Sequence, residues 1–190
     1  MARAKKEFNF EDSKAVMTAL LDSRTDDRTV AVVAAAYIDK YLDMALATLM
    51  PGITDELKDK IFGVYGSVNT MAAKIDLSAA MNLIDDEGRR SMIAINRLRN
   101  RFAHDIHVSS FDHPEVVSLS KDIPMSENMK KMSGMFHRED HETYRELPRP
   151  RFTLAAMGFC MGLNNFVLAK QWEASHPGEV AHGPSPDKSE

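Results

Sequence analysis

The fold is decided by the stretch RTVAVVAAAYIDKYLDMALATLM, which occupies residues 28–50. Its apolar residues recur at i, i+3, i+4 and i+7 for about six turns, a spacing that gathers them on one face of an α-helix. Asp26 and Asp27 precede the stretch as candidate N-caps, and Pro51-Gly52 follows it as a stop signal, because proline disfavours helical backbone in the residue before it. The stretch predicts a long amphipathic helix whose apolar stripe comprises Val30, Val33, Ala34, Tyr37, Ile38, Tyr41, Leu42, Ala45, Leu46 and Leu49.

Further helices are predicted on both sides of this one. Apolar residues at helical spacing, with caps or prolines at the ends, place them at residues 11–21, 55–62, 67–84, 85–101, 115–120 and 152–172. Alternation of apolar and polar residues, which is typical of a strand, is limited to a weak hint at Ile106 and Val108. We therefore expect an all-α protein, a single-domain helical bundle of about six to eight helices without a substantial sheet.

Three segments differ from the helical domain, which we expect to span residues 11–172. Residues 1–10 contain three basic residues and are expected to form a flexible basic N-terminus. Residues 125–150 mix acidic and basic residues with prolines, so we expect a charged, solvated connection there. Residues 173–190 are polar and contain three prolines, which predicts a disordered tail.

Composition indicates which cellular compartment and which class of protein to expect. The 190 residues are 44% hydrophobic and 27% charged, which is ordinary for a globular chain. A single cysteine, Cys160, can form no internal disulfide, and it falls in the most apolar predicted helix, where a thiol stays protonated and inert. No apolar region follows the basic start, and no stretch reaches the roughly 18 consecutive apolar residues of a membrane span, so we expect a soluble cytoplasmic protein with no membrane contact.

The charge balance argues against a protein that reads DNA directly. There are 24 Lys plus Arg against 28 Asp plus Glu, a net charge of −4, whereas non-specific nucleic-acid binders are usually basic. Acidic residues lie just upstream of the one dense basic patch, which comprises Arg89, Arg90, Arg97, Arg99 and Arg101. We therefore do not expect direct DNA binding, and any contact with nucleic acid must be local.

The stretch NRLRNRFAHDIH, residues 96–107, concentrates polar groups at the end of a helix that must also pack. Asn100 and His104 are four residues apart and so share a face, as do Arg97 and Arg101. Arg99 lies about 140° round an ideal helix from His104, so these two meet only through the long arginine side chain or a distorted last turn.

Two interpretations of this stretch are open. A histidine exchanges a proton near neutral pH, and a guanidinium binds phosphate through paired hydrogen bonds. His104 as general acid or base, Arg99 as the group that stabilises charge on phosphorus, and Asn100 as the orienting group would cleave RNA without a metal. Alternatively, the basic residues stabilise the helix end by complementing its dipole and bonding its last carbonyls, and residue types alone favour this structural role.

We predict no cofactor and no metal site. Metal-compatible donors do cluster in a short stretch, but their spacing matches no ordered zinc pattern; they are His104, Asp105, His107, Asp112 and His113. The lone Cys160 cannot build a thiolate cage either.

Five blocks of sequence, in order, resemble the mannitol-operon repressor family of bacteria. They are VAAAYIDKYLDMAL (33–46), YGSVNTMAAKIDLSAAMNLID (65–85), INRLRNRFAHD (95–105), FDHPEV (111–116) and RFTLAA (151–156). The resemblance leaves residues 125–150 and both ends uncovered. It implies an all-helical regulator of transcription that has no DNA-binding motif of its own and that represses through a protein partner.

The same residues also resemble the HEPN superfamily of helical proteins, whose ribonuclease members carry arginine, a polar residue, three further residues and then histidine. Arg99, Asn100 and His104 fit that spacing. The resemblance implies a site formed across a homodimer. The residues expected to support it are Asp39 or Asp43, as an acidic partner from the long helix, together with Arg97, which offers a second match to the motif, and Arg101.

Our leading hypothesis is a regulatory protein that influences transcription through contact with a protein partner. We also expect a homodimer, because the apolar helix at 152–172 offers an interface. The alternative is a toxin-like, metal-independent endoribonuclease that binds RNA.

Overall fold

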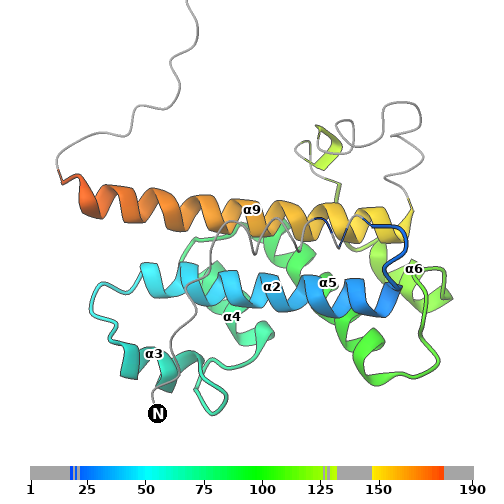
Figure 1. Ribbon diagram of the computed structural model, residues 1–190, viewed down its shortest axis with the longest axis horizontal. Helices are drawn as coiled ribbons and strands as arrows, with labels where there is room; N and C mark the ends of the chain where they lie inside the picture. Colours follow the sequence, from blue (N-terminus) through cyan, green and yellow to red (C-terminus); the bar gives the residue numbers. More distant parts are fainter. Residues whose placement is uncertain are drawn as a thin grey trace, which may run out of the picture.

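The computed structural model describes residues 18, 20, 22–125, 127, 129–131 and 147–177. Within these ranges the chain forms helices and loops and no strand, which confirms the prediction of an all-α bundle. Ile106 and Val108, the weak strand hint, lie in a loop. The helices shown in Figure 1 are α2 (Asp27–Thr48), α3 (Asp55–Phe62), α4 (Met71–Ala80), α5 (Asp86–His104), α6 (Pro114–Ser120) and α9 (Pro148–Ser175).

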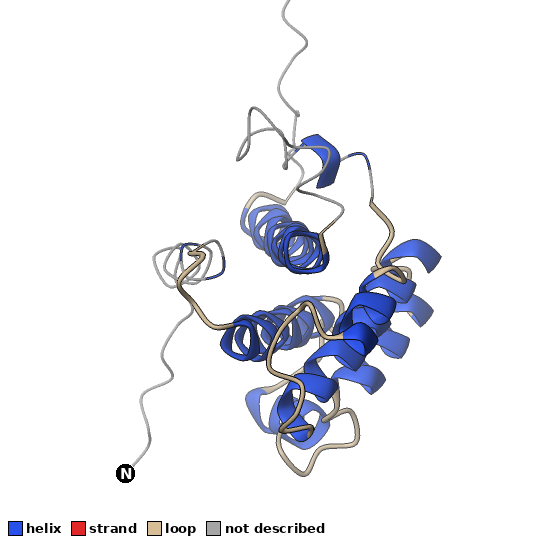
Figure 2. Ribbon diagram, turned by 90° about the vertical axis from the view of Figure 1, so that its right-hand side faces the viewer, coloured by secondary structure: helices blue, strands red, loops and turns tan. Residues whose placement is uncertain are grey.

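α2 is the centre of the bundle, because α4, α5 and α9 all pack against it. α9 lies alongside α2 for much of its length (Figure 1), and Figure 2, which looks along both helices, shows one stacked above the other. The buried surface of α2 is broader than the predicted stripe, since Ala31 and Ala35 are buried while Val33 and Tyr37 are only half-buried. The small alanine side chains let the neighbouring helices approach closely.

Side-chain caps begin α2 and α5. Asp26 is the N-cap of α2, and its carboxylate accepts a hydrogen bond from the Thr29 backbone at 2.9 Å. Asp85 caps α5 in the same way, accepting from the Gly88 backbone at 2.7 Å. Because the hydrogen bonds from Thr29 favour the charged form, they lower the pKa of Asp26.

α4 is shorter at both ends than the helix predicted at 67–84. Its N-cap is Thr70, whose hydroxyl accepts a backbone hydrogen bond, so the helix begins four residues later than predicted. The preceding residues belong to a loop instead, since the Asn69 side chain donates to a loop carbonyl at 2.7 Å. After α4, Asn82 adopts the left-handed backbone (φ 55°) that asparagine tolerates, which ends the helix early.

α9 begins at 148 rather than 152 and ends at 175 rather than 172. It therefore includes the last residues of the predicted connection 125–150 and the first residues of the predicted tail 173–190. Pro148 and Pro150 fit the first turn, where a backbone N–H has no partner within the helix. Most of the rest of these two segments lies outside the described residues, as do residues 1–10 and most of the helix predicted at 11–21.

α9 changes from core to surface along its length. Phe152 and Ala156 are fully buried, whereas Met161 and Leu168 are about half exposed. Although its apolar run is interrupted, an 18-residue window of mean hydropathy 1.5 makes α9 long and apolar enough, by length and composition alone, to cross a membrane; half of that window is buried in the bundle. Burial raises the pKa of the Cys160 thiol to about 12, which supports the prediction of a protonated thiol.

Candidate functional site

The candidate residues other than the two aspartates come from α5, whose buried side anchors them. Ile95, Leu98 and Phe102 are fully buried there. The Phe102 ring packs against Phe111 with centroids 4.9 Å apart. The polar side chains of the same helix turn outward, so that Arg99 is half-buried and the exposed residues are Arg97, Asn100, Arg101 and His104.

A first groove, which we call the α6 groove, runs between α5 and α6 with a volume of about 560 Å³. Across it, Arg101 Nε lies 3.2 Å from Glu115 Oε2, and both side chains are about half exposed. An exposed ion pair contributes at most about 1 kcal/mol, so Arg101 can exchange Glu115 for another anion at little cost. The groove is lined by Arg97, Asn100, Arg101, Glu115, Ser118 and Leu119.

A second groove, the α4 groove, lies where α5 meets α2 and α4 and has a volume of about 530 Å³. Asp39, Arg99 and Asn100 contribute to its polar lining. Arg99 Nη1 donates a hydrogen bond to Asn100 Oδ1 at 2.9 Å. Because Asn100 lines both grooves, it stands on the ridge between them.

The two aspartates proposed as acidic partners both bind a buried lysine. Lys74 is 2% exposed, and its Nζ lies 2.9 Å from Asp39 Oδ2 and 2.8 Å from Asp43 Oδ1. Burial raises the pKa of Asp43, and the attraction of Lys74 opposes that shift. Asp39 also lines the α4 groove and keeps one oxygen, Oδ1, buried without a hydrogen bond in the described chain. Asp39 is therefore the aspartate that shares the α4 groove with Arg99.

Sequence reasoning missed Lys74, although a signal was present. The lysine falls on the apolar side of its helix, at helical spacing from the buried Ile75 and Ser78. A cation on a buried face needs a carboxylate partner, because an isolated buried charge is too costly. The polar edge of the long first helix, where Asp39 and Asp43 were singled out, supplies it.

Arg28, from the first turn of α2, binds one carbonyl in the last turn of α5 and further carbonyls at its C-cap and in the loop that follows. Its Nη1 donates to the Phe102 carbonyl at 2.6 Å, and its Nη2 donates to the carbonyls of Asp105 at 3.1 Å and Val108 at 2.9 Å. The structural interpretation gave carbonyl binding to the arginines and the histidine of α5 itself, and no such bond is found among the described residues. Arg101 and His104 do lie in the last turn, where basic side chains complement the helix dipole. No local sequence signal points to Arg28, because its first acceptor lies 74 residues further along the chain.

His104 is exposed and, within the described residues, makes no hydrogen bond or ion pair. It lines neither groove. No contact joins it to Arg99, as the angle of about 140° between them predicts. A single chain thus brings together Asp39, Arg99 and Asn100, and presents His104 separately, one turn beyond Asn100 on the same side of α5.

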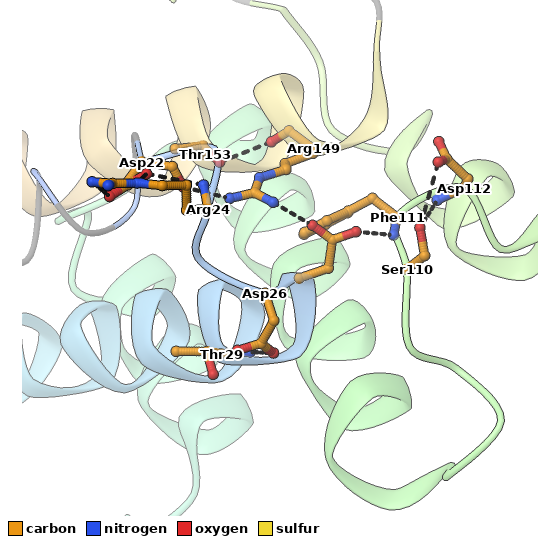
Figure 3. A network of polar contacts seen from close by, with 10 residues as sticks. Asp22, Arg24, Asp26, Thr29, Ser110, Phe111, Asp112, Arg149 and Thr153 are labelled. Carbon is orange, nitrogen blue, oxygen red and sulfur yellow. Dashed lines mark hydrogen bonds and ion pairs between the residues drawn. The ribbon is translucent and has the colours of Figure 1, made fainter.

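A neighbouring network ties the start of α9 to the start of α2 (Figure 3). Arg149 donates from Nη2 to the Asp22 carbonyl at 2.9 Å and from Nη1 to Asp27 Oδ1 at 2.6 Å. The other carboxylate oxygen of Asp27 accepts from the Phe111 backbone at 2.8 Å. Since Arg28 is the next residue, the start of α2 fixes both α9 and the loop after α5, and His104 sits on an anchored helix end.

The site offers hydrogen-bond donors and positive charge for an anion. Among the described residues, no group of three or more His, Cys, Asp or Glu side chains is arranged to hold a metal ion. In the stretch of metal-compatible donors, Asp105 instead accepts a hydrogen bond from the His107 backbone at 2.9 Å. The groups that line the two grooves include the guanidinium groups of Arg97, Arg99 and Arg101, the Asn100 amide and the carboxylates of Asp39 and Glu115.

Comparisons with known proteins found no match to a family model, to a curated protein or to a solved structure. The resemblances to the mannitol-operon repressor family and to the HEPN superfamily therefore stay predictions.

Proposed function

We propose that this protein is a regulator of the mannitol-operon repressor type, which acts in the cytoplasm by binding a protein partner rather than by reading DNA. The observation that supports the proposal is the loop between α3 and α4. It presents two adjacent apolar side chains to solvent, Val64 at 81% exposed and Tyr65 at 100% exposed. A pair of apolar residues held out in this way gains free energy when a partner covers it.

The shape of this loop is set by its sequence. Asn69 donates to the Val64 carbonyl at 2.7 Å, and the Gly66 backbone donates to the Gly63 carbonyl at 2.8 Å. A Cβ at Gly63 or Gly66 would lie 2.3 Å from a backbone oxygen, so neither position accepts a side chain without movement. Because the loop is shaped before it binds, less ordering entropy is lost on binding.

The test is affinity capture from cells that express the protein, with a Val64→Ser/Tyr65→Ser variant in parallel. We expect a partner that wild type recovers and that the variant recovers at least tenfold less. Ile106→Ser is the matched control, since it removes an apolar side chain of similar exposure, 79%, from a different loop. Recovery of the same proteins by all three chains, or of none by wild type, would contradict the proposal.

A second candidate function is a metal-independent endoribonuclease. It is favoured by the exposure of His104 together with the binding of the helix-end carbonyls by Arg28, which frees the histidine from a capping role. His104 would act as general acid or base at the 2′-hydroxyl or the leaving oxygen. The guanidinium of Arg99 would stabilise charge on the phosphate, with Asn100 beside it.

This candidate is tested with pure protein, RNA and EDTA. Cleavage by wild type should fall by at least about 100-fold in His104→Ala, which is the usual contribution of a general acid or base. His107→Ala is the matched control, because it removes another exposed histidine close by and should cleave normally. Equal cleavage by wild type and His104→Ala, or none by either, disposes of the candidate.

A further inference from the structure

Four basic or ionisable side chains follow one line along the exposed side of α5. At 100° per residue, positions 90, 97, 101 and 104 fall within about 60° of one another, and they extend over about 21 Å of helix. All four side chains are exposed. We call this line the α5 stripe, and it consists of Arg90, Arg97, Arg101 and His104.

The stripe differs in its contacts from three other arginines that the structure describes. Arg28 binds carbonyls, Arg89 binds Asp76, and Arg149 binds Asp27. By contrast, within the described residues neither Arg90 nor Arg97 makes a hydrogen bond or an ion pair. The one carboxylate bound to the stripe is Glu115, through the half-exposed pair with Arg101. The fold makes little use of these charges.

We propose that the α5 stripe binds the phosphodiester backbone of a single-stranded polynucleotide. Guanidinium groups bind phosphate through paired hydrogen bonds, and a line of them follows a chain of phosphates. The α6 groove runs beside Arg97 and Arg101, and in it Asn100 and Ser118 offer neutral hydrogen-bonding groups to a nucleoside. This inference goes beyond both functions proposed above, because binding requires neither cleavage nor a protein partner.

The surroundings of α5 limit the ligand to a single strand. α6 packs against α5 beside Arg97 and Arg101, so the stripe borders the α6 groove and does not stand free as the base-reading face of a recognition helix does. Carboxylates also bound the stripe: Asp86 and Glu87 lie in the first turn, Asp105 follows the last turn and Glu115 faces Arg101. With three arginines and one histidine, the stripe between these acids can contact only about three or four phosphates.

The experiment uses full-length protein and fluorescence anisotropy of a labelled 12-nucleotide RNA that carries 2′-O-methyl groups, so that it cannot be cleaved. We expect wild type to bind with a dissociation constant of about 1 to 100 µM near physiological salt and with a log–log salt slope of about −2 to −3. Arg90→Gln/Arg97→Gln should weaken binding about tenfold or more and reduce the slope by about 1.4, which corresponds to two lost phosphate contacts.

The control is Lys40→Gln/Lys131→Gln, which removes the same net charge from exposed positions outside α5. It should bind as wild type does. Equal weakening by both double variants, no binding by wild type, or equally tight binding of a duplex would overturn the proposal.

A DNA strand of the same sequence shows whether the protein distinguishes an RNA backbone from a DNA backbone. Binding of RNA and DNA with equal affinity shows recognition of phosphate alone, and tighter binding of RNA adds a contact to the ribose; both results support the stripe. Stripe-dependent binding in a protein that does not cleave unmodified RNA would support this inference while the ribonuclease candidate fails.

Discussion

The two sides of α5 are constrained differently. On one side Ile95, Leu98 and Phe102 are fully buried, because α2, α4, α6 and α9 pack around the helix. On the other side Arg90 and Arg97 contact no partner in the described chain. Packing explains the three apolar residues of the first side, whereas no contact in the described chain explains Arg90 or Arg97 on the second. The comparison teaches that function is best sought among charges that the fold leaves unused.

The largest effect is expected on the buried side, from Phe102→Ala. The Phe102 ring is fully buried and packs against Phe111, so its removal leaves a cavity that the neighbours fill only in part. We expect the free energy of unfolding to fall by about 3 to 5 kcal/mol, measured by urea denaturation followed by circular dichroism. A loss below about 1 kcal/mol would show that the two sides of α5 do not differ as described.

A cation that the fold does use provides the next test, Lys74→Met. This change leaves Asp39 and Asp43 partly buried without their counter-ion, and we expect a loss of about 3 kcal/mol at pH 7. Burial already raises the pKa of Asp43, and without Lys74 it must rise further. When folding raises the pKa of a carboxyl group, the free energy of unfolding falls as the pH rises above the unfolded-state pKa of 3.8.

The cost of Lys74→Met should therefore shrink as the pH is lowered from 7 towards 4, where the carboxyl groups become protonated. Urea denaturation of wild type and variant at several pH values measures this. A cost that stays constant over the range would mean that packing of the lysine side chain, and not its charge, stabilises the fold.

Arg28→Ala is expected to have an intermediate effect. The guanidinium binds the carbonyls of Phe102, Asp105 and Val108, and hydrogen bonds from a charged donor contribute about 1.5 to 3 kcal/mol. We expect a loss of about 2 kcal/mol and faster hydrogen exchange at the end of α5. Arg28→Lys should recover only part of the loss, because an ammonium lacks the planar fork that reaches several acceptors. If the free energy of unfolding of Arg28→Ala stays within about 0.5 kcal/mol of wild type, Arg28 does not stabilise the end of α5 as proposed.

These residues also show which features the sequence could reveal. Asp26 caps the helix that begins at the next residue and binds a backbone N–H three residues on, so the local sequence pattern predicted it as a candidate cap. The start of α4 at Thr70 was missed because the preceding residues bond within their own loop, a preference that helical periodicity does not register. Arg28 could not be found, since its acceptors lie more than 70 residues away and only the packed bundle brings them near. The motif of α5 and the angle between Arg99 and His104 followed from helical spacing, but the α4 groove that Arg99 lines together with Asp39 needed the packed structure.

The smallest effect on stability is expected from Arg90→Gln/Arg97→Gln, and it completes the comparison of the two sides. With no partner in the described chain, both side chains should be removable with a change within about 0.5 kcal/mol. A helix end gains from nearby positive charge, but both residues lie outside the last turn, where that effect has faded. A loss above about 1 kcal/mol would make the stripe a structural feature. Unchanged stability together with weakened polynucleotide binding separates the ligand from the fold, because both measurements come from the same variant.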